Sequence, residues 1–286
     1  MSTTASATLK WDVLVTNRQV ITRDLPPGKD QWTWVPTSAT LIFGQRDAVL
    51  VDAFLTVEQA TKLVEWVAAS GKNLTTIYAT HGHADHFFGL APLLERFPGA
   101  KAIATPAVVA AMQATLTPAS LDGFWRKLFP GQIPDRLRVA EPLEGNEFEL
   151  EGHRLVAVET GRTDTAASTS LHIPSIGLIV AGDVVYNGIH PYLGETDEQS
   201  RQEWISSLDK LAGLKPRAVV AGHKLPESDD DPRNIAETQR YLRDFDRLNG
   251  TTATARELYD AMLALYPDRA NPGSLWGGAK AAKKQA

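Results

Sequence analysis

The sequence predicts a mixed α/β (α+β) fold in a single domain that spans residues 1–286. Short apolar runs typical of buried strands recur along the chain, and segments whose apolar residues have helical spacing follow them. The alternation occurs in both halves, and polar motifs follow strands in each of them. A chain of 286 residues could form one large domain or two small ones, and the even distribution of motifs favours one.

The first half of the chain predicts paired strands followed by helices. The turn Gly44-Gln45-Arg46-Asp47 separates two apolar runs, which predicts a hairpin of strands at 39–43 and 48–52. Residues 57–69 have one apolar face at helical spacing and Gly71 just beyond their end, which predicts a helix. A strand at 76–80, a short helix at 90–97 closed by Pro98-Gly99, and a strand at 102–104 complete this half.

The second half predicts another set of strands and then a helical C-terminal region. Strands are expected at 154–159, 169–173, 178–181 and 218–221, with a helix at 201–211 before the last of them. The region 232–266 is expected to form two helices, at 234–248 and 254–265. Residues 279–286 are rich in lysine and alanine, which predicts a frayed tail.

Residues 117–135 interrupt the alternation and predict a helical insertion between the halves. Prolines at 118, 130 and 134 bracket an aromatic and basic segment that contains Phe124 and Trp125. These side chains could form a lid that walls a substrate pocket, or a connector that buries its aromatic rings in the core. Trp32 and Trp34 are open to the same two interpretations, with core packing the favoured one.

The composition narrows the classes of partner. The formal net charge is −5, so the chain has no broad basic field for nucleic acid. No apolar run reaches the length of a membrane span, and the N-terminal residues 1–6 lack the basic start and apolar centre of a signal peptide. We therefore expect a cytoplasmic protein that acts on a small molecule. The sequence does not determine its oligomeric state.

The densest chemical signal is the run His81-Gly82-His83-Ala84-Asp85-His86, directly after the predicted strand at 76–80. It places four side chains that can ligate a metal within six residues, although the whole chain has only 7 histidines. Imidazole nitrogen and carboxylate oxygen are ordinary Zn²⁺ ligands. His81 and His83 would project the same way from an extended chain. The run therefore predicts a metal site at the end of this strand, which two adjacent ions could share.

With the motifs that follow it, this run resembles the metallo-β-lactamase fold superfamily of hydrolases, over about residues 40–223. The strand that ends in Asp52 resembles the family's early strand, and Ala181-Gly182-Asp183 resembles the strand whose aspartate bridges two metals. The strand that ends in His223 resembles the last one, with the final histidine ligand. The resemblance implies a four-layer αββα sandwich. It implies a first metal site that contains His81 and His83, and a second built from Asp85, His86 and His223 with Asp183.

One position departs from the family pattern. The family has a further histidine ligand in a Gly-His-Thr context, where this sequence reads Gly161-Arg162-Thr163. A guanidinium has no lone pair for a metal, so the resemblance implies a first site short of one ligand and at most one tightly bound ion. Asp164 could supply the ligand if the loop rearranged, and His172 is a second alternative. Arg162 could also bind a carboxylate or phosphate of the substrate.

The absence of cysteine bears on the chemistry. With 0 cysteines the chain forms no disulfides, and Asp183 stands where two β-lactamase subclasses of the superfamily have a thiolate ligand. Aspartate there is the pattern of the superfamily's lactonases, glyoxalase II-like thioesterases and phosphodiesterases. The expected cofactor is Zn²⁺, as one or two ions, with Mn²⁺ or Fe²⁺ as alternatives. The resemblance assigns Asp85 to orienting a water molecule or carrying its proton. Tyr186 would assist the substrate carbonyl, or would only pack on the second sheet.

These observations predict a metal-dependent hydrolase that cleaves an ester-like bond through a metal-bound hydroxide. A lactone or carboxylic ester is favoured over a thioester, phosphodiester or β-lactam. The alternative is a metal-binding or ligand-binding protein with little activity, because Arg162 replaces a first-site ligand. The sequence has no G-x-S-x-G elbow, H-E-x-x-H helix, P-loop or dinucleotide fingerprint.

Overall fold

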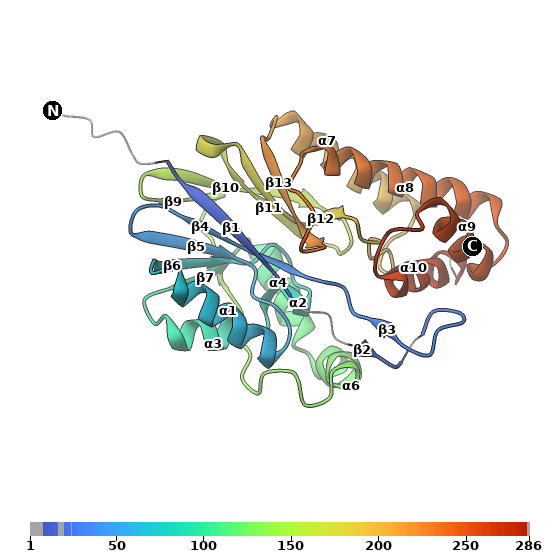
Figure 1. The fold of residues 1–286 in the computed structure, drawn as a ribbon, viewed down its shortest axis with the longest axis horizontal. Coiled ribbons are helices and arrows are strands. Elements are labelled where there is room, and N and C mark those ends of the chain that lie inside the picture. Colours follow the sequence, from blue (N-terminus) through green and yellow to red (C-terminus); the bar gives the residue numbers. More distant parts are fainter. Residues whose placement is uncertain (1–7, 17–19, 24, 285–286) are drawn as a thin grey trace.

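Two β-sheets packed face to face form the centre of the computed structural model, which describes residues 8–16, 20–23 and 25–284. Figure 1 shows α1 (Val57–Ala69) and α3 (Leu90–Arg96) on one side of the paired sheets, and α7 (Glu198–Gly213) and α8 (Arg233–Thr251) on the other. The layers therefore run helix, sheet, sheet, helix. This architecture confirms the predicted αββα sandwich.

The first sheet has six strands in the order β1-β4-β5-β6-β7-β8. Strands β1, β4 and β5 pair antiparallel, whereas β5 to β8 are parallel. The predicted hairpin is confirmed, with Gly44 N–H donating to Asp47 O at 3.0 Å in its turn. The strands are β1 (Lys10–Val15), β4 (Ser38–Phe43), β5 (Asp47–Val51), β6 (Asn73–Tyr78), β7 (Lys101–Ala104) and β8 (Glu141–Pro142).

The second sheet has five strands in the order β13-β12-β11-β10-β9, and only β12 and β13 are parallel. The short strands β2 (Val20–Ile21) and β3 (Trp32–Thr33) pair separately. The strands of the second sheet are β9 (Glu147–Leu150), β10 (His153–Gly161), β11 (Ser168–Ile173), β12 (Leu178–Asn187) and β13 (Ala218–Lys224).

The core has three parts, and alternate residues of single strands contribute to different parts. In β5, Val49 and Val51 lie between the two sheets, while Ala48 and Leu50 pack on the side of α1. Successive side chains of a strand point to opposite faces, so a strand in an inner layer is apolar on both faces. The continuous apolar run at 48–51 reflects this double burial.

The remaining helices extend both outer layers. The segment at 117–135 does contain helical turns, but they are short. Within the described residues, no helix is both long and apolar enough to cross a lipid bilayer. These elements are α2 (Ala84–Phe87), α4 (Pro106–Thr115), α5 (Pro118–Ser120), the π-helical turn η1 (Leu121–Trp125), α6 (Arg126–Leu128), the 3₁₀ turn η2 (Pro174–Ile176), α9 (Ala255–Leu265) and α10 (Pro272–Lys284).

The prediction of a frayed tail is wrong for the described part of residues 279–286. Helix α10 continues to Lys284, and its residues Leu275, Ala279 and Ala282 are buried in the core of the second sheet. The lysines of the segment stay at its surface, so its composition alone concealed the buried stripe. Residues 285 and 286 lie outside the described part of the chain.

Glu151 joins the turn of the β9–β10 hairpin to the turn of the β4–β5 hairpin. Its carboxylate accepts hydrogen bonds from the backbone N–H groups of Gln45, Arg46 and Asp47, at 2.9, 2.7 and 2.9 Å. These three bonds, that of Asp47 first, lower the pKa of Glu151 from 4.5 to about 2. The ionised carboxylate therefore holds one end of the two sheets together.

We expect Glu151→Gln to lower the melting temperature at neutral pH. The folded pKa of Glu151 is below its unfolded value, so the stabilisation is complete above about pH 4.5 and is lost as the pH falls toward 2. Calorimetry from pH 7 to pH 3 should show a constant difference from the wild type that shrinks below pH 4.5. Glu149→Gln, at an exposed position of the same hairpin, is the matched control. A difference independent of pH would contradict the assignment.

Candidate metal centre

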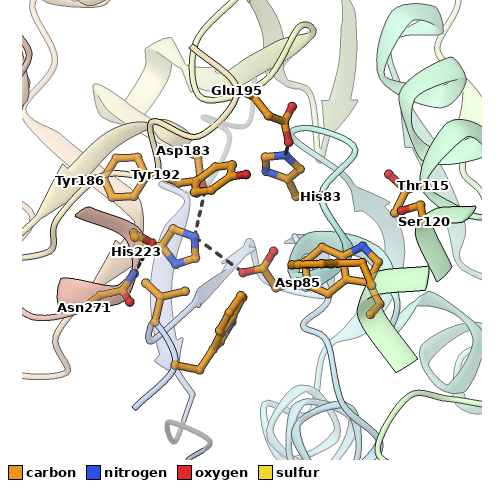
Figure 2. Close-up of a pocket in the computed structure, with 15 residues that line it drawn as sticks. His83, Asp85, Thr115, Ser120, Asp183, Tyr186, Tyr192, Glu195, His223 and Asn271 are labelled. Atoms are coloured by element: carbon orange, nitrogen blue, oxygen red, sulfur yellow. Dashed lines mark hydrogen bonds and ion pairs between the residues drawn. The ribbon is translucent and has the colours of Figure 1, made fainter. Parts of the chain in front are cut away.

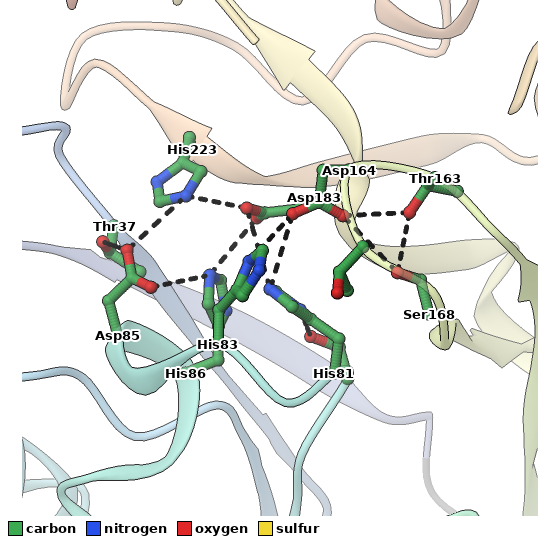
Figure 3. A network of polar contacts seen from close by, with 12 residues as sticks. Thr37, His81, His83, Asp85, His86, Thr163, Asp164, Ser168, Asp183 and His223 are labelled. Atoms are coloured by element: carbon green, nitrogen blue, oxygen red, sulfur yellow. Dashed lines mark hydrogen bonds and ion pairs between the residues drawn. The ribbon is translucent and has the colours of Figure 1, made fainter. Parts of the chain in front are cut away.

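Segments from both sheets bring the predicted ligands together. The loop after β6 carries His81 to His86, and the parallel neighbours β12 and β13 carry Asp183 and His223. The connection between β10 and β11 carries Asp164. Backbone N–H of Thr169 donates to Thr80 O at 3.0 Å, which ties this connection to the end of β6. The four segments therefore converge where the two sheets meet (Figure 3).

Four side chains form a first group of candidate ligands: His81, His83, Asp164 and Asp183. His83 Nδ1 lies 3.0 Å from Asp164 Oδ2, and His81 Nε2 lies 3.8 Å from that same oxygen. His81 Nε2 is also 3.8 Å from Asp183 Oδ2. Ligands about 2 Å from one tetrahedral ion lie about 3.3 Å apart. The spacing of this group suits a single divalent cation.

Asp85, His86 and His223 form a second group. His223 Nε2 lies 3.7 Å from Asp85 Oδ2, and His86 Nε2 lies 4.0 Å from Asp85 Oδ1. Asp183 touches this group as well, with its two oxygens 3.3 Å from His86 Nε2 and 2.9 Å from His223 Nε2. Asp183 therefore stands between the groups and can serve both. A Cβ on Gly222 would lie 2.3 Å from Asp183 Oδ1, so glycine is required beside this carboxylate.

Buried atoms without hydrogen-bond partners show that these residues fit a metal. Among them are His81 Nε2, His86 Nε2, Asp164 Oδ2 and Asp183 Oδ1. A buried polar atom normally has a partner, because leaving it unpaired is costly. These four atoms belong to the two groups and face the space between them (Figure 3). Two divalent cations would satisfy them all.

A second set of contacts orients the four imidazoles. In each ring the other nitrogen meets an oxygen of a neighbouring group. Such contacts fix the tautomer and present the remaining nitrogen to a metal. The pairs are His81 Nδ1 with Thr80 Oγ1 at 3.1 Å, His83 Nε2 with Glu195 Oε1 at 3.1 Å, His86 Nδ1 with Asp52 Oδ2 at 2.8 Å, and His223 Nδ1 with Pro36 O at 2.9 Å.

Comparison with known sequences agrees with this arrangement. The profile of the metallo-beta-lactamase superfamily matches residues 32–223, which contain every residue of both groups. The chain belongs to the metallo-β-lactamase superfamily. The family resemblance predicted from the sequence is thereby confirmed.

Two curated relatives and two solved structures are similar to this superfamily member. Hydroxyacylglutathione hydrolase of Synechococcus sp. (strain CC9902) is 29% identical over 64% of this chain and 64% of its own length. Hydroxyacylglutathione hydrolase of Parasynechococcus marenigrum (strain WH8102) is 27% identical over 73% of this chain and 74% of its own length. A metallo-beta-lactamase family protein of Thermus thermophilus superposes with a TM-score of 0.61 at 24% identity, over 86% of this chain and 87% of its own. A beta-lactamase domain protein of Burkholderia ambifaria superposes with a TM-score of 0.61 at 18% sequence identity. The match covers 93% of this chain and 84% of that protein. The structural likenesses concern the fold alone.

Asp164, and not Arg162, faces the first group. The Asp164 side chain is fully buried and lies beside His81 and His83 without any rearrangement of the loop. Arg162 is exposed and does not line the cavity. The structure therefore places a fourth candidate ligand in the first group, where a shortage was expected, and the number of bound ions stays a prediction. His172 lies in β11 and belongs to neither group.

The charge of Arg162 acts outside the cavity. Burial raises the pKa of Glu195, but three neighbours outweigh it, so the pKa is lowered overall. These neighbours are His83, through its hydrogen bond and charge, Thr165, through its hydrogen bond, and Arg162, through its charge. The charge of Arg162 also lowers the pKa of Asp197, so this guanidinium lies near acidic side chains at the rim of the cavity. Arg162 does not line the cavity, and its predicted contact with a carboxylate or phosphate of the substrate stays a prediction.

The protonation states of His81 and Asp183 suit a cation. Burial, followed by the charge of His86, lowers the pKa of His81 well below its usual value, so this imidazole stays neutral. Burial opposes ionisation of Asp183, yet the charges of His223 and His86 hold its pKa well below the usual range. A neutral imidazole beside an ionised carboxylate is the state in which both bind a metal. Burial opposes the protonation of His83, His86 and His223, but neighbouring carboxylates outweigh it and raise their pKa, so a cation would displace protons from these three rings.

A cavity of about 320 Å³ opens over both groups. Figure 2 shows His83, Asp85 and His223 facing the same space. Phe124 and Trp125 both line it; Trp125 is buried, whereas Phe124 is 47% exposed, so the insertion contributes to the pocket wall and to the core at once. Sequence reasoning missed seven wall residues, which come from distant segments: Val35, Thr115, Ser120, Tyr192, Glu195, Asn271 and Ser274.

Trp34 belongs to the wall as well as to the core, although core packing was its favoured interpretation. Its ring meets Trp125 and Phe129 edge to face, with centroids 6.3 and 5.1 Å apart. Tyr186 lies at the base of the cavity, and its hydroxyl donates to Asp183 Oδ2 at 3.0 Å. Burial, and then the charge of Asp183, raises the pKa of Tyr186 well above its usual value. The phenol is therefore a proton donor at any physiological pH.

Proposed function

We propose that this protein is a metal-dependent hydrolase that cleaves a carboxylic ester or lactone. The observation that carries the proposal is the pair of buried ligand groups, joined by Asp183, at the base of an aromatic-walled cavity. His81, His83, Asp164 and Asp183 would hold one divalent ion, and Asp85, His86, His223 and Asp183 the other. Such ions supply a hydroxide nucleophile at neutral pH and polarise a carbonyl oxygen.

Asp85 and Tyr186 are the residues that we assign to proton handling. Asp85 lines the cavity, and its Oδ2 accepts a hydrogen bond from the Thr37 hydroxyl at 3.4 Å. The same oxygen lies 3.7 Å from His223 Nε2, so the carboxylate borders both the other ligands of the second group and the substrate space. A carboxylate there can orient a water molecule and accept its proton. If the Tyr186 hydroxyl turned its single proton away from Asp183, it could donate to the oxygen that gains charge at the substrate carbonyl.

The cavity wall supports an uncharged substrate over a glutathione conjugate. Trp34, Phe124 and Trp125 give the wall an apolar surface, and the residues described as lining it include no lysine or arginine. Glu195 adds a negative charge at its edge, and its side chain is 47% exposed. The curated relatives are named for hydroxyacylglutathione, whose glutathione part carries two carboxylates. A wall with this charge would repel such a group, which favours a neutral ester or lactone.

A substrate panel that separates bond type from charge tests the proposal. One acyl group is offered as an alkyl ester, as a lactone of matched size, as a neutral thioester and as its glutathione thioester, with added Mn²⁺ or Zn²⁺. We expect kcat/KM to be highest for the ester or lactone. We also expect it to be about tenfold or more higher for the neutral thioester than for the glutathione thioester, because close like charges repel by about 1–4 kcal/mol. Faster cleavage of the glutathione thioester, or turnover of a phosphodiester alone, would overturn this assignment.

A further inference from the structure

We propose that Asp164 gives the first site a second carboxylate in place of a third imidazole, and that this shifts the metal preference of the centre from Zn²⁺ toward Mn²⁺. The inference rests on the proposed function only in that both need a metal centre. It concerns which ion is bound and not which bond is cleaved.

One oxygen of Asp164 is held by the protein and the other is directed at the first group. Oδ1 accepts hydrogen bonds from the hydroxyls of Thr163 at 2.9 Å and Ser168 at 3.4 Å. Oδ2 has no hydrogen-bond partner although it is buried, and it lies 3.0 Å from His83 Nδ1. The carboxylate is therefore fixed on one side and directs its other oxygen at the two imidazoles of the first group.

The nitrogen of His81 that faces Asp164 is an acceptor too. Thr80 Oγ1 donates its only proton to Asp52, at 2.9 and 3.1 Å from the two carboxylate oxygens, so it must accept from His81 Nδ1. His81 Nε2 then carries a lone pair, 3.8 Å from Asp164 Oδ2 and without a hydrogen-bond partner. A cation between two buried acceptors at this distance would satisfy both of them.

The resulting centre is rich in oxygen ligands. The first group offers two imidazoles with Asp164 and Asp183, and the second offers two imidazoles with Asp85 and Asp183. A histidine at the position of Asp164 would give the first site three imidazoles and would remove one negative charge. Imidazole suits Zn²⁺, whereas carboxylate oxygen suits Mn²⁺. Asp164 therefore contributes more to the binding of Mn²⁺ than to that of Zn²⁺.

Metal-binding measurements on the full chain test this directly, without any substrate. Dissociation constants for Mn²⁺ and Zn²⁺ are measured by chelator competition on wild type, Asp164→Asn and Asp164→His. We expect Asp164→Asn to raise the dissociation constant of the more weakly bound of the two Mn²⁺ ions at least tenfold. The dissociation constant of the corresponding Zn²⁺ ion should rise by a smaller factor. Asp164→His should raise the preference for Zn²⁺ over Mn²⁺ at least tenfold. Asp229→Asn, an exposed carboxylate in the loop after β13, is the matched control and should leave both constants unchanged.

Electron paramagnetic resonance gives a second readout. Wild type with two equivalents of Mn²⁺ should show the signal of a coupled pair, and Asp164→Asn the six-line signal of isolated ions. Equal weakening of Mn²⁺ and Zn²⁺ in Asp164→Asn would show that the carboxylate does not set the preference. Unchanged constants would show that Asp164 is not a ligand. Because Asp164→Asn preserves the size of the side chain, it decides the matter even where Asp164→His folds poorly.

Discussion

Asp183→Asn is expected to release both metal ions on dialysis and to lower hydrolysis by about a thousandfold or more. Asp183 is the only residue whose oxygens lie within 4 Å of imidazoles of both described groups, at 3.8 Å from His81, 3.3 Å from His86 and 2.9 Å from His223. Replacing it removes an anionic ligand from two sites at once. Elemental analysis of the dialysed protein and the rate with the best ester of the panel measure the two effects.

The fold of this variant should survive, because asparagine has the size of aspartate and can still accept the hydrogen bond from Tyr186. Circular dichroism checks that the secondary structure is unchanged. Asp229→Asn again serves as the control, since this aspartate pairs with Arg233 at the surface and should keep both ions and full activity. Retention of two equivalents of metal by Asp183→Asn would contradict the bridging position.

Asp52→Ala is expected to reduce the free energy of unfolding by about 3 kcal/mol and to weaken binding of the second ion about 10–100-fold. The carboxylate is buried, accepts from Thr80 N–H at 2.9 Å and holds His86 Nδ1 at 2.8 Å. Its loss leaves buried donors unpaired and frees the imidazole to turn. Asp52 also has a backbone φ of 65°, which aspartate tolerates better than alanine.

Urea unfolding and metal titration separate the two consequences. Asp47→Ala, at the opposite end of β5, is the matched control because the Asp47 carboxylate meets only surface groups, the Asn73 amide at 2.9 Å and the Arg46 guanidinium at 3.8 Å. It should change stability by less than about 1 kcal/mol and leave metal affinity unaltered. If Asp52→Ala bound the second ion as tightly as wild type, the contact with His86 would have no part in positioning that ligand.

Several parts of the fold were predictable because their causes are local. The helix at 57–69 was placed at its observed bounds, since its apolar spacing and the Thr56 cap lie within its own sequence. The strands of the inner layers could be predicted from continuous apolar runs, which double burial requires. Helix α10 was missed because its small buried residues, Gly278, Ala279 and Ala282, resemble those of a flexible tail.

The sequence by itself determined the chemical type of the site, because six of its ligand candidates stand in or beside strands with recognisable motifs. It could not determine that Asp164 completes the first group, since that depends on the connection between β10 and β11 folding against the end of β6. Nor could it exclude Arg162 from the cavity, because the direction of a loop side chain is set by contacts distant in sequence. The cavity wall, from Val35 to Ser274, was decided by tertiary packing alone for the same reason.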